Sequence, residues 1–173
     1  MNTVRLGFTA LGALTALLSG CGRDPEVTTT PTVSKDVLTR EITERLTTTG
    51  EVPQSVTCRE DLLGEVGRTA RCEVVLSPTN SFEPVISVTG VDGSSIDYVV
   101  RPAVSKEQLE QAVSRLAAVP GVTIGPVVCD SGLDGTVGAV TQCDVDSGGV
   151  KVRRTVAVNN VEGLMMNFDL VPS

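Results

Sequence analysis

The sequence predicts an α+β protein made of two tandem units, each with one helix packed on a four-stranded antiparallel sheet and one disulfide inside the unit. Two observations lead to this prediction. The first is an internal repeat, because a shift of 71 residues superimposes the segment from Cys58 to Cys72 on the segment from Cys129 to Cys143. The second is that each copy begins with the signals of a capped amphipathic helix and continues with those of four short strands.

The repeat divides most of the chain into two units of about 70 residues, 33–102 and 104–173. Past a deletion of one residue, a shift of 70 residues carries Val91-Asp92-Gly93 onto Val161-Glu162-Gly163. Solenoid repeats are shorter, at roughly 20 to 50 residues. We therefore expect two small domains side by side rather than an extended array.

The four repeated cysteines can pair in three ways. The pairing Cys58–Cys72 and Cys129–Cys143 is favoured, because only a bridge within a unit would be duplicated together with its unit. A small unit buries a modest core, and closing a loop of about 15 residues contributes roughly 3 kcal/mol in the chain-entropy model. A four-thiolate metal site and a redox pair are the alternatives, but the sequence contains no Cys-x-x-Cys motif.

In the first unit a helix is expected after Ser34, whose side chain can cap the N-terminus, while Val33 and Leu38 form a hydrophobic staple. Leu38, Ile42 and Leu46 follow at intervals of four residues. This spacing places the three side chains on one face of the helix and predicts that this face is buried.

The second unit repeats the helix signals. Ser105 is the expected cap, Gln108 can complete a capping box, and Val104 forms the staple with Leu109. The expected buried stripe consists of Leu109, Ala112, Val113 and Leu116. Pro120-Gly121 then stops the helix.

Strand signals follow each helix. Segments rich in β-branched residues predict strands at 55–58, 68–76, 85–91 and 95–101 in the first unit, and at 123–129, 139–145, 150–158 and 164–171 in the second. Asp92-Gly93 and Glu162-Gly163 supply the turns before the last strands. Because the helix covers one face of such a sheet, the other face stays open. We expect the two open faces to form the functional surface.

The N-terminus has the pattern of an export signal. Arg5 precedes an apolar run that ends in Leu18-Ser19-Gly20-Cys21, which resembles the lipobox of bacterial lipoproteins. The resemblance implies that residues 1–20 are a signal peptide and that Cys21 is lipidated. The alternative is an ordinary secretory signal in which Cys21 is incidental. Residues 21–32 contain the lipidated cysteine and a Thr/Pro-rich tether.

The charge of the chain restricts its partners. Removing residues 1–20 removes Arg5 and no acidic residue, so the net charge changes from −7 to −8. Such a chain is not expected to bind nucleic acid, and anionic headgroups should repel its surface. The predicted contact with the membrane is therefore the lipid on Cys21, at the extracytoplasmic face of the cell membrane.

The residue types that usually perform catalysis are scarce. The sequence has no histidine, the commonest general base, and no Gly-x-Ser-x-Gly motif. Carboxylates do lie within and beside the predicted disulfide loops, at Glu60, Asp61, Asp130, Asp134, Asp144 and Asp146. The four aspartates of the second unit could in principle hold Ca²⁺, but their spacing does not match an EF-hand, and a solvated acidic turn is favoured. We predict no catalytic residues, no metal site and no cofactor, and therefore a protein that is not an enzyme.

Few side chains are suited to anchor a partner. Beyond Phe8 of the predicted signal, the aromatic residues are Phe82, Tyr98 and Phe168, and we expect them in the core. Met165 and Met166 form a small adaptable apolar spot. Strand alternation should bury one of these methionines, and the other could face a partner, so they are the predicted interaction surface.

Together, these features resemble one known family. A signal with a lipobox, a Thr/Pro tether and the pattern Val-x-Cys…Val-Gly…Cys-x-Val are similar to the actinobacterial domain of unknown function number 4333. The pattern spans Val56 to Val74 in the first unit. The second unit follows it less closely. The resemblance implies an actinobacterial lipoprotein with two tandem copies of this domain, and the family carries no established activity.

Three functional hypotheses remain open. The leading one is a lipid-anchored envelope protein whose tandem domains bind an envelope protein or a glycolipid and catalyse nothing. The second is an inhibitor or modulator of an extracytoplasmic enzyme, since the architecture is similar to that of β-lactamase inhibitor proteins, although this chain lacks their aromatic residues. The third is a carrier of a lipid or other hydrophobic ligand, which would need an apolar cavity of roughly 300 to 1,000 Å³.

Overall fold

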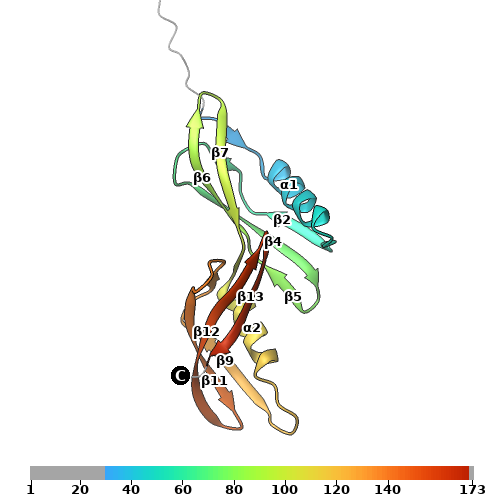
Figure 1. The fold of residues 1–173 in the computed structure, drawn as a ribbon, viewed down its shortest axis with the longest axis vertical. Helices are drawn as coiled ribbons and strands as arrows, with labels where there is room; N and C mark the ends of the chain where they lie inside the picture. Colours follow the sequence, from blue (N-terminus) through green and yellow to red (C-terminus); the bar gives the residue numbers. More distant parts are fainter. Residues whose placement is uncertain (1–29, 172–173) are drawn as a thin grey trace, which may run out of the picture.

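The two repeats lie end to end in an elongated molecule (Figure 1). The computed structural model describes residues 30–171. The predicted signal peptide, the predicted lipidation residue Cys21 and most of the tether fall outside these residues. The predicted fold class is confirmed, because two helices pack on antiparallel sheets in two tandem units. Across the described residues, no helix combines the length and the apolar character needed to cross a membrane.

The first repeat forms a sheet whose strand order is β2-β4-β6-β7, with β5 paired to β4. Its elements are β1 (Thr32–Val33), α1 (Lys35–Thr48), β2 (Ser55–Cys58), β3 (Leu62–Leu63), β4 (Thr69–Ser77), β5 (Asn80–Phe82), β6 (Val85–Asp92) and β7 (Ser95–Arg101). The short strand β5 was not predicted. It is separated from β6 at Pro84, which has no N–H group to donate to a neighbouring strand.

The second repeat forms a four-stranded sheet of order β13-β12-β11-β9. Its elements are β8 (Ala103–Val104), α2 (Lys106–Leu116), β9 (Ile124–Cys129), β10 (Leu133–Asp134), β11 (Val140–Ser147), β12 (Val150–Glu162) and β13 (Met165–Val171). Arg154 stands where the first repeat has Pro84, so β12 runs without interruption and four residues beyond its predicted end. The one-residue difference between the repeats lies at the bulge in β4 between Val75 and Ser77.

Both helices begin as predicted. The Ser34 side chain accepts a hydrogen bond from the Val37 amide, and Ser105 and Gln108 form a capping box. The apolar faces bury Leu38, Ile42 and Leu46 in α1, and Leu109 and Val113 in α2. The prediction that Leu116 is buried is wrong, because α2 ends at Leu116 and this side chain is 53% exposed. In Figure 1 both helices lie on the same side of the molecule, which leaves the uncovered sheet faces on the other side.

Two disulfides bridge neighbouring strands and confirm the predicted pairing. Cys58 on β2 faces Cys72 on β4, and Cys129 on β9 faces Cys143 on β11. The Cys72 amide donates to the Pro84 carbonyl on the opposite side of β4, so the bridge joins a pair that is not hydrogen-bonded. Side chains approach each other most closely in such pairs. All four cysteines are buried, so the bridges are part of the core.

In each repeat, one additional short ladder joins the disulfide loop to the segment before the helix. β1 pairs with β3, and β8 pairs with β10. These pairings were not predicted, because strands of two residues carry no periodic signal. Leu62 in β3 and Leu133 in β10 are buried against the core.

The buried side chains form one hydrophobic cluster that continues through both repeats. Phe82 of the first repeat, together with Val104 and Leu164 of the second, belongs to this cluster. The expectation of two small domains side by side is therefore refined, since the two units share a core across their junction.

Candidate functional site

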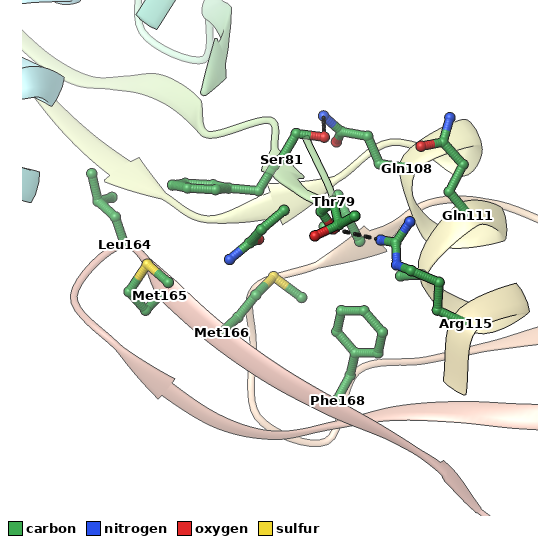
Figure 2. Close-up of a pocket in the computed structure, with 13 residues that line it drawn as sticks. Thr79, Ser81, Gln108, Gln111, Arg115, Leu164, Met165, Met166 and Phe168 are labelled. Carbon is green, nitrogen blue, oxygen red and sulfur yellow. Dashed lines mark hydrogen bonds between the residues drawn. The ribbon is translucent and has the colours of Figure 1, made fainter. Parts of the chain in front are cut away.

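The junction between the repeats is formed by the β12–β13 turn, α2 and β5 (Figure 2). Leu164 lies at this turn and is 8% exposed. It lines a small cavity together with Phe82 of the first repeat. Leu164 also borders a second hollow that is formed with α1 and β7. A leucine at the tip of the last hairpin is thus a main apolar contact between the repeats.

Polar contacts hold α2 and β8 against the edge of the first sheet. Gln108 Nε2 lies 3.3 Å from Ser81 Oγ, and Arg115 Nη2 donates to the Thr79 carbonyl at 2.7 Å (Figure 2). The Glu83 amide donates to the Ala103 carbonyl at 2.7 Å. The edge of the first sheet that carries β5 is therefore covered by the second repeat.

Met165 and Met166, the predicted interaction surface, lie at this same junction. Both side chains are partly buried and pack against the core cluster. With Phe168 they line a cavity of about 70 Å³ (Figure 2). A cavity of this size is well below the roughly 300 Å³ of small-molecule pockets. The methionines therefore contribute to the packing between the repeats.

A larger hollow of about 530 Å³ lies between α1, β7 and the β12–β13 turn. It is open to solvent, and most of its lining is charged or carries a hydroxyl group, as in Glu41, Glu44, Arg45, Thr48 and Thr49. A carrier of hydrophobic molecules needs an enclosed apolar cavity. This hollow is open to solvent and is therefore not enclosed.

Each repeat has an ion-pair cluster. The central residue of the cluster is acidic in the first repeat and basic in the second. In the first repeat the Glu83 side chain is 6% exposed and lies between two arginines, with Arg59 Nη2 at 2.6 Å and Arg71 Nη1 at 3.3 Å. In the second repeat Arg153 lies between two aspartates, with Asp130 Oδ2 at 2.5 Å and Asp144 Oδ1 at 3.2 Å. Each repeat therefore places one charge between two opposite charges, and the signs are exchanged.

Several carboxylates in and beside the disulfide loops also have structural partners. Glu60 accepts a hydrogen bond from the Arg71 amide, and Asp61 accepts one from the Lys35 amide. Asp146 accepts from the Gly149 amide in the β11–β12 turn. Among residues 30–171, no three His, Cys, Asp or Glu side chains gather closely enough to hold a metal ion. Of the predicted acidic turn in the second repeat, Asp146 therefore supports the local backbone, and Asp130 and Asp144 pair with Arg153.

Among residues 30–171, two ionisable groups have clearly shifted pKa values. Burial raises the pKa of Tyr98 to about 12, and the hydrogen bond from its hydroxyl to the Glu41 carboxylate and the negative charge of Glu41 act in the same direction. The pKa of Glu107 is lowered, first by a hydrogen bond from its own backbone amide and then by Ser105. Glu41 also accepts from Arg45, and both of these residues line the hollow beside α1.

The comparison with protein families agrees with the internal repeat. Residues 16–93 and residues 94–163 each match the model of the Domain of unknown function (DUF4333). The chain belongs to the DUF4333 family. No curated protein and no solved structure matches it.

The structure explains why the two DUF4333 copies share a glycine two residues after the buried leucine of the disulfide loop. The Gly64 amide donates to the Pro31 carbonyl at 2.7 Å, and the Gly135 amide donates to the Pro102 carbonyl at 2.8 Å. A Cβ atom on Gly64 would lie 2.8 Å from the Pro31 oxygen, and one on Gly135 would lie 2.3 Å from the Pro102 oxygen. The close approach of the two backbones therefore requires glycine at both positions.

A third hollow lies at the free end of the second DUF4333 copy, and the sequence analysis did not predict it. This groove, of about 360 Å³, is lined by residues of α2, the loop after it, β11, β12 and β13. We call it the terminal groove, and it is lined by Leu116, Ala117, Val119, Val145, Ser147, Val152, Arg154, Leu170 and Val171. A comparison of the two copies could have indicated this groove, because several of its residues are apolar where the first copy has polar residues at the equivalent positions.

Proposed function

We propose that this protein is an actinobacterial lipoprotein, anchored through a lipid on Cys21 at the extracytoplasmic face of the cell membrane. Its tandem DUF4333 domains bind another envelope component, either a protein or a glycolipid, and catalyse no reaction. The observation that carries the proposal is the apolar N-terminal run ending in Leu18-Ser19-Gly20-Cys21. The two buried disulfides are consistent with it, since disulfides persist in extracytoplasmic compartments.

Cysteine usage gives the proposal further support. The sequence has five cysteines. Four of them form the two bridges, and Cys21 is the one that remains. A free exposed thiol would be reactive outside the cell, whereas lipidation consumes it.

Intact mass measurement of the protein from a membrane fraction of its own host tests the anchor. The expected product begins at an acylated Cys21 and retains both disulfides in non-reducing peptide mapping. A Cys21→Ala variant, which changes no other cysteine, should leave the membrane fraction. Recovery of an unmodified soluble chain with a free Cys21 thiol would overturn the anchor.

Photo-crosslinking in intact cells tests the binding role. A photoreactive residue is placed singly at exposed positions on the uncovered sheet faces and at both ends of the molecule. A discrete crosslinked envelope component that depends on the position of the probe is the expected result. Uniform absence of adducts from all positions would contradict a binding function.

A further inference from the structure

A small pocket of about 200 Å³ lies where the two repeats meet, on the side of the first sheet that faces away from the core. Strands β4, β6 and β7 of the first repeat line it together with residues 134–136 of the second repeat, at the end of β10 and just after it. The hydrogen bond from the Gly135 amide to the Pro102 carbonyl, at 2.8 Å, fixes these two parts against each other. The pocket therefore depends on the packing of both repeats.

Two arginines of this pocket belong to one row across the sheet. Arg71 on β4 pairs with Val85 on β6, and Val85 pairs with Arg101 on β7. The next residue on β6, Ile86, is buried in the core, so alternation along the strand directs the row to the opposite face. Neighbouring strands lie about 4.8 Å apart, so roughly 10 Å separates the two arginine backbones. Their long side chains can reach the same space over the smaller valine.

The charges around the pocket leave an excess of positive charge. Glu83 Oε2 lies 3.3 Å from Arg71 Nη1, and the same carboxylate pairs with Arg59, so one acidic group serves two guanidinium groups. The Arg101 guanidinium makes no ion pair or hydrogen bond with any of the residues 30–171. In a chain whose net charge is −7, such a local positive site attracts an anion.

The other polar groups of the lining suit a ligand that also carries hydroxyl groups. These groups are the hydroxyls of Ser87 and Thr136 and the carboxylate of Asp134. Guanidinium donors bind the oxygens of a phosphate or a carboxylate. An ionised aspartate can only accept hydrogen bonds, so it would repel a bare anion but bind a hydroxyl of the ligand. The combination selects a molecule with both an acidic group and hydroxyl groups.

We infer that this junction pocket binds an acidic sugar. Arg71 and Arg101 hold its phosphate or carboxylate group, and Asp134 accepts a hydrogen bond from a sugar hydroxyl. The pocket is smaller than the roughly 300 to 1,000 Å³ of drug-sized ligand sites, so it suits one sugar unit. This inference rests on the binding role proposed above and adds the site and the ligand class. The sugar unit can be free or can be the headgroup of a glycolipid.

The second repeat shows that the fold itself does not require the two arginines. Gln142 stands at the position of Arg71, and Val171 stands at the position of Arg101. The strands β11, β12 and β13 nevertheless pair in the same order as β4, β6 and β7. The arginine pair is thus a feature of the first repeat, and we expect one acidic sugar to bind per chain.

An NMR titration of the isotope-labelled full chain tests the inference. Glucose 6-phosphate and glucuronate are the probes, and glucose and inorganic phosphate are the reference ligands. The acidic sugars should shift the amides of Ser87, Arg101 and Thr136 with saturation at one site. Glucose should cause no shift, and inorganic phosphate should bind at least about threefold more weakly than glucose 6-phosphate, because it lacks the hydroxyl contacts. Absence of saturation with both acidic sugars up to about 10 mM, or equal shifts with glucose, would overturn the inference.

Two arginine variants form a matched pair. Arg101→Gln should weaken binding of both acidic sugars by at least about tenfold, because a charged hydrogen-bond donor is lost. Arg40→Gln removes an exposed arginine of α1, outside the pocket, and changes the net charge by the same amount. It should leave binding unchanged. Circular dichroism establishes that each variant is folded. Equal weakening by both variants would reduce the effect to general electrostatic attraction and contradict the site.

The aspartate separates a sugar site from a simple anion site. Asp134→Ala should weaken binding of glucose 6-phosphate by about threefold to tenfold, because a hydrogen bond to the sugar is lost. The same variant should bind inorganic phosphate more tightly, because a negative charge beside the anion is removed. Tighter binding of both ligands would show that Asp134 makes no contact with the sugar, and the assignment to acidic sugars would fail.

Vesicle binding distinguishes the two sources of the sugar. The Cys21→Ala chain, which cannot carry a lipid of its own on that residue, is mixed with phosphatidylcholine vesicles that contain glucuronosyl diacylglycerol. Binding that Arg101→Gln abolishes would identify a glycolipid headgroup as the ligand. Binding of the free acidic sugars without binding of these vesicles would identify a sugar outside the bilayer. Either result supports the junction pocket as the site.

Failure of this inference can be told apart from failure of the proposed function. If neither acidic sugar binds while photo-crosslinks to an envelope component form at other positions, the inference fails and the binding function stands. If the sugars bind and no position yields a crosslink in cells, the pocket is supported and the proposed envelope partner is contradicted.

Discussion

Glu83 and Arg153 occupy the same position in the two repeats and carry opposite charges. Among their ion-pair partners, Arg59 and Asp130 also occupy equivalent positions with opposite charges, whereas Arg71 corresponds to Gln142 and Asp144 corresponds to Glu73. The two clusters differ in burial, since the Glu83 side chain is almost fully covered and about half of the Arg153 side chain is exposed. The cluster around Glu83 should therefore contribute more to the free energy of unfolding than the cluster around Arg153.

Neutralising the central charge should affect the repeats unequally. Glu83→Gln should lower the free energy of unfolding by about 1–3 kcal/mol, because a buried carboxylate loses two charged partners. Arg153→Gln should lower it by less than about 1 kcal/mol, because its ion pairs are half exposed and screened by solvent. Urea denaturation measures both values. Equal losses would show that burial does not set the strength of these clusters.

Removal of either disulfide should cost a similar amount of stability. The variants Cys58→Ser/Cys72→Ser and Cys129→Ser/Cys143→Ser each open a bridge of sequence separation 14. The chain-entropy model then predicts a loss of about 2–4 kcal/mol for each pair. Urea denaturation of both double variants gives the comparison. If removal of only one of the two bridges lowered the stability, restriction of the unfolded chain would not be the main source of the stabilisation.

Alanine at the shared glycines should destabilise both repeats, and the second more than the first. A Cβ atom at residue 135 would lie 2.3 Å from a backbone oxygen, against 2.8 Å at residue 64. Gly135→Ala should therefore lower the thermal midpoint more than Gly64→Ala, because the two chain segments must move further apart. Thermal unfolding followed by circular dichroism ranks the two variants. The reverse order would indicate that the β1–β3 ladder tolerates less movement than β8–β10.

The single tyrosine reports on the first repeat at high pH. Because the folded-state pKa of Tyr98 is raised to about 12 from its ordinary value of 10.0, the protonated hydroxyl contributes stability that is fully present below pH 10.0 and is lost as the pH rises toward 12. Tyrosinate absorbance should give a midpoint near 12 in the folded protein. Glu41→Gln should lower this midpoint only in part, since burial is the larger cause. A complete return to the ordinary value would show that Glu41 dominates.

Truncation of Leu164 should uncouple the two repeats. Leu164→Ala removes a buried apolar contact at the junction and should cost about 2–4 kcal/mol. Tyrosine fluorescence follows the first repeat alone, because the only tyrosine is Tyr98, whereas circular dichroism follows both repeats. The two unfolding curves should coincide in the wild type and separate in the variant.

Leu116→Ala is the matched control for this prediction. It also truncates a leucine of the second repeat, but at an exposed position where the cost should be below about 0.5 kcal/mol. Coincident curves in the Leu164 variant would show that the polar contacts of α2 are sufficient to couple the repeats.

The sequence alone predicted much of the fold. The helix beginnings at Ser34 and Ser105 and the positions of the eight main strands follow from capping residues and from apolar periodicity over a few neighbouring residues. The pairing of the cysteines followed from their duplication. The two-residue ladders and β5 could not be predicted in this way, because segments so short have no period.

The candidate sites depended on contacts that local patterns do not contain. Met165 and Met166 were singled out by composition, and only the docking of the β12–β13 turn on the first repeat placed them at the junction. The exposure of Leu116 likewise follows from where α2 ends relative to its sheet.

The sequence by itself determined the repeat, the class of fold and the two disulfide loops, since each depends on spacing along the chain. The tertiary structure decided which surfaces of the repeats are covered and which stay exposed. The physical reason is that burial depends on contacts between segments distant in the sequence, such as those by which the second repeat covers an edge of the first sheet.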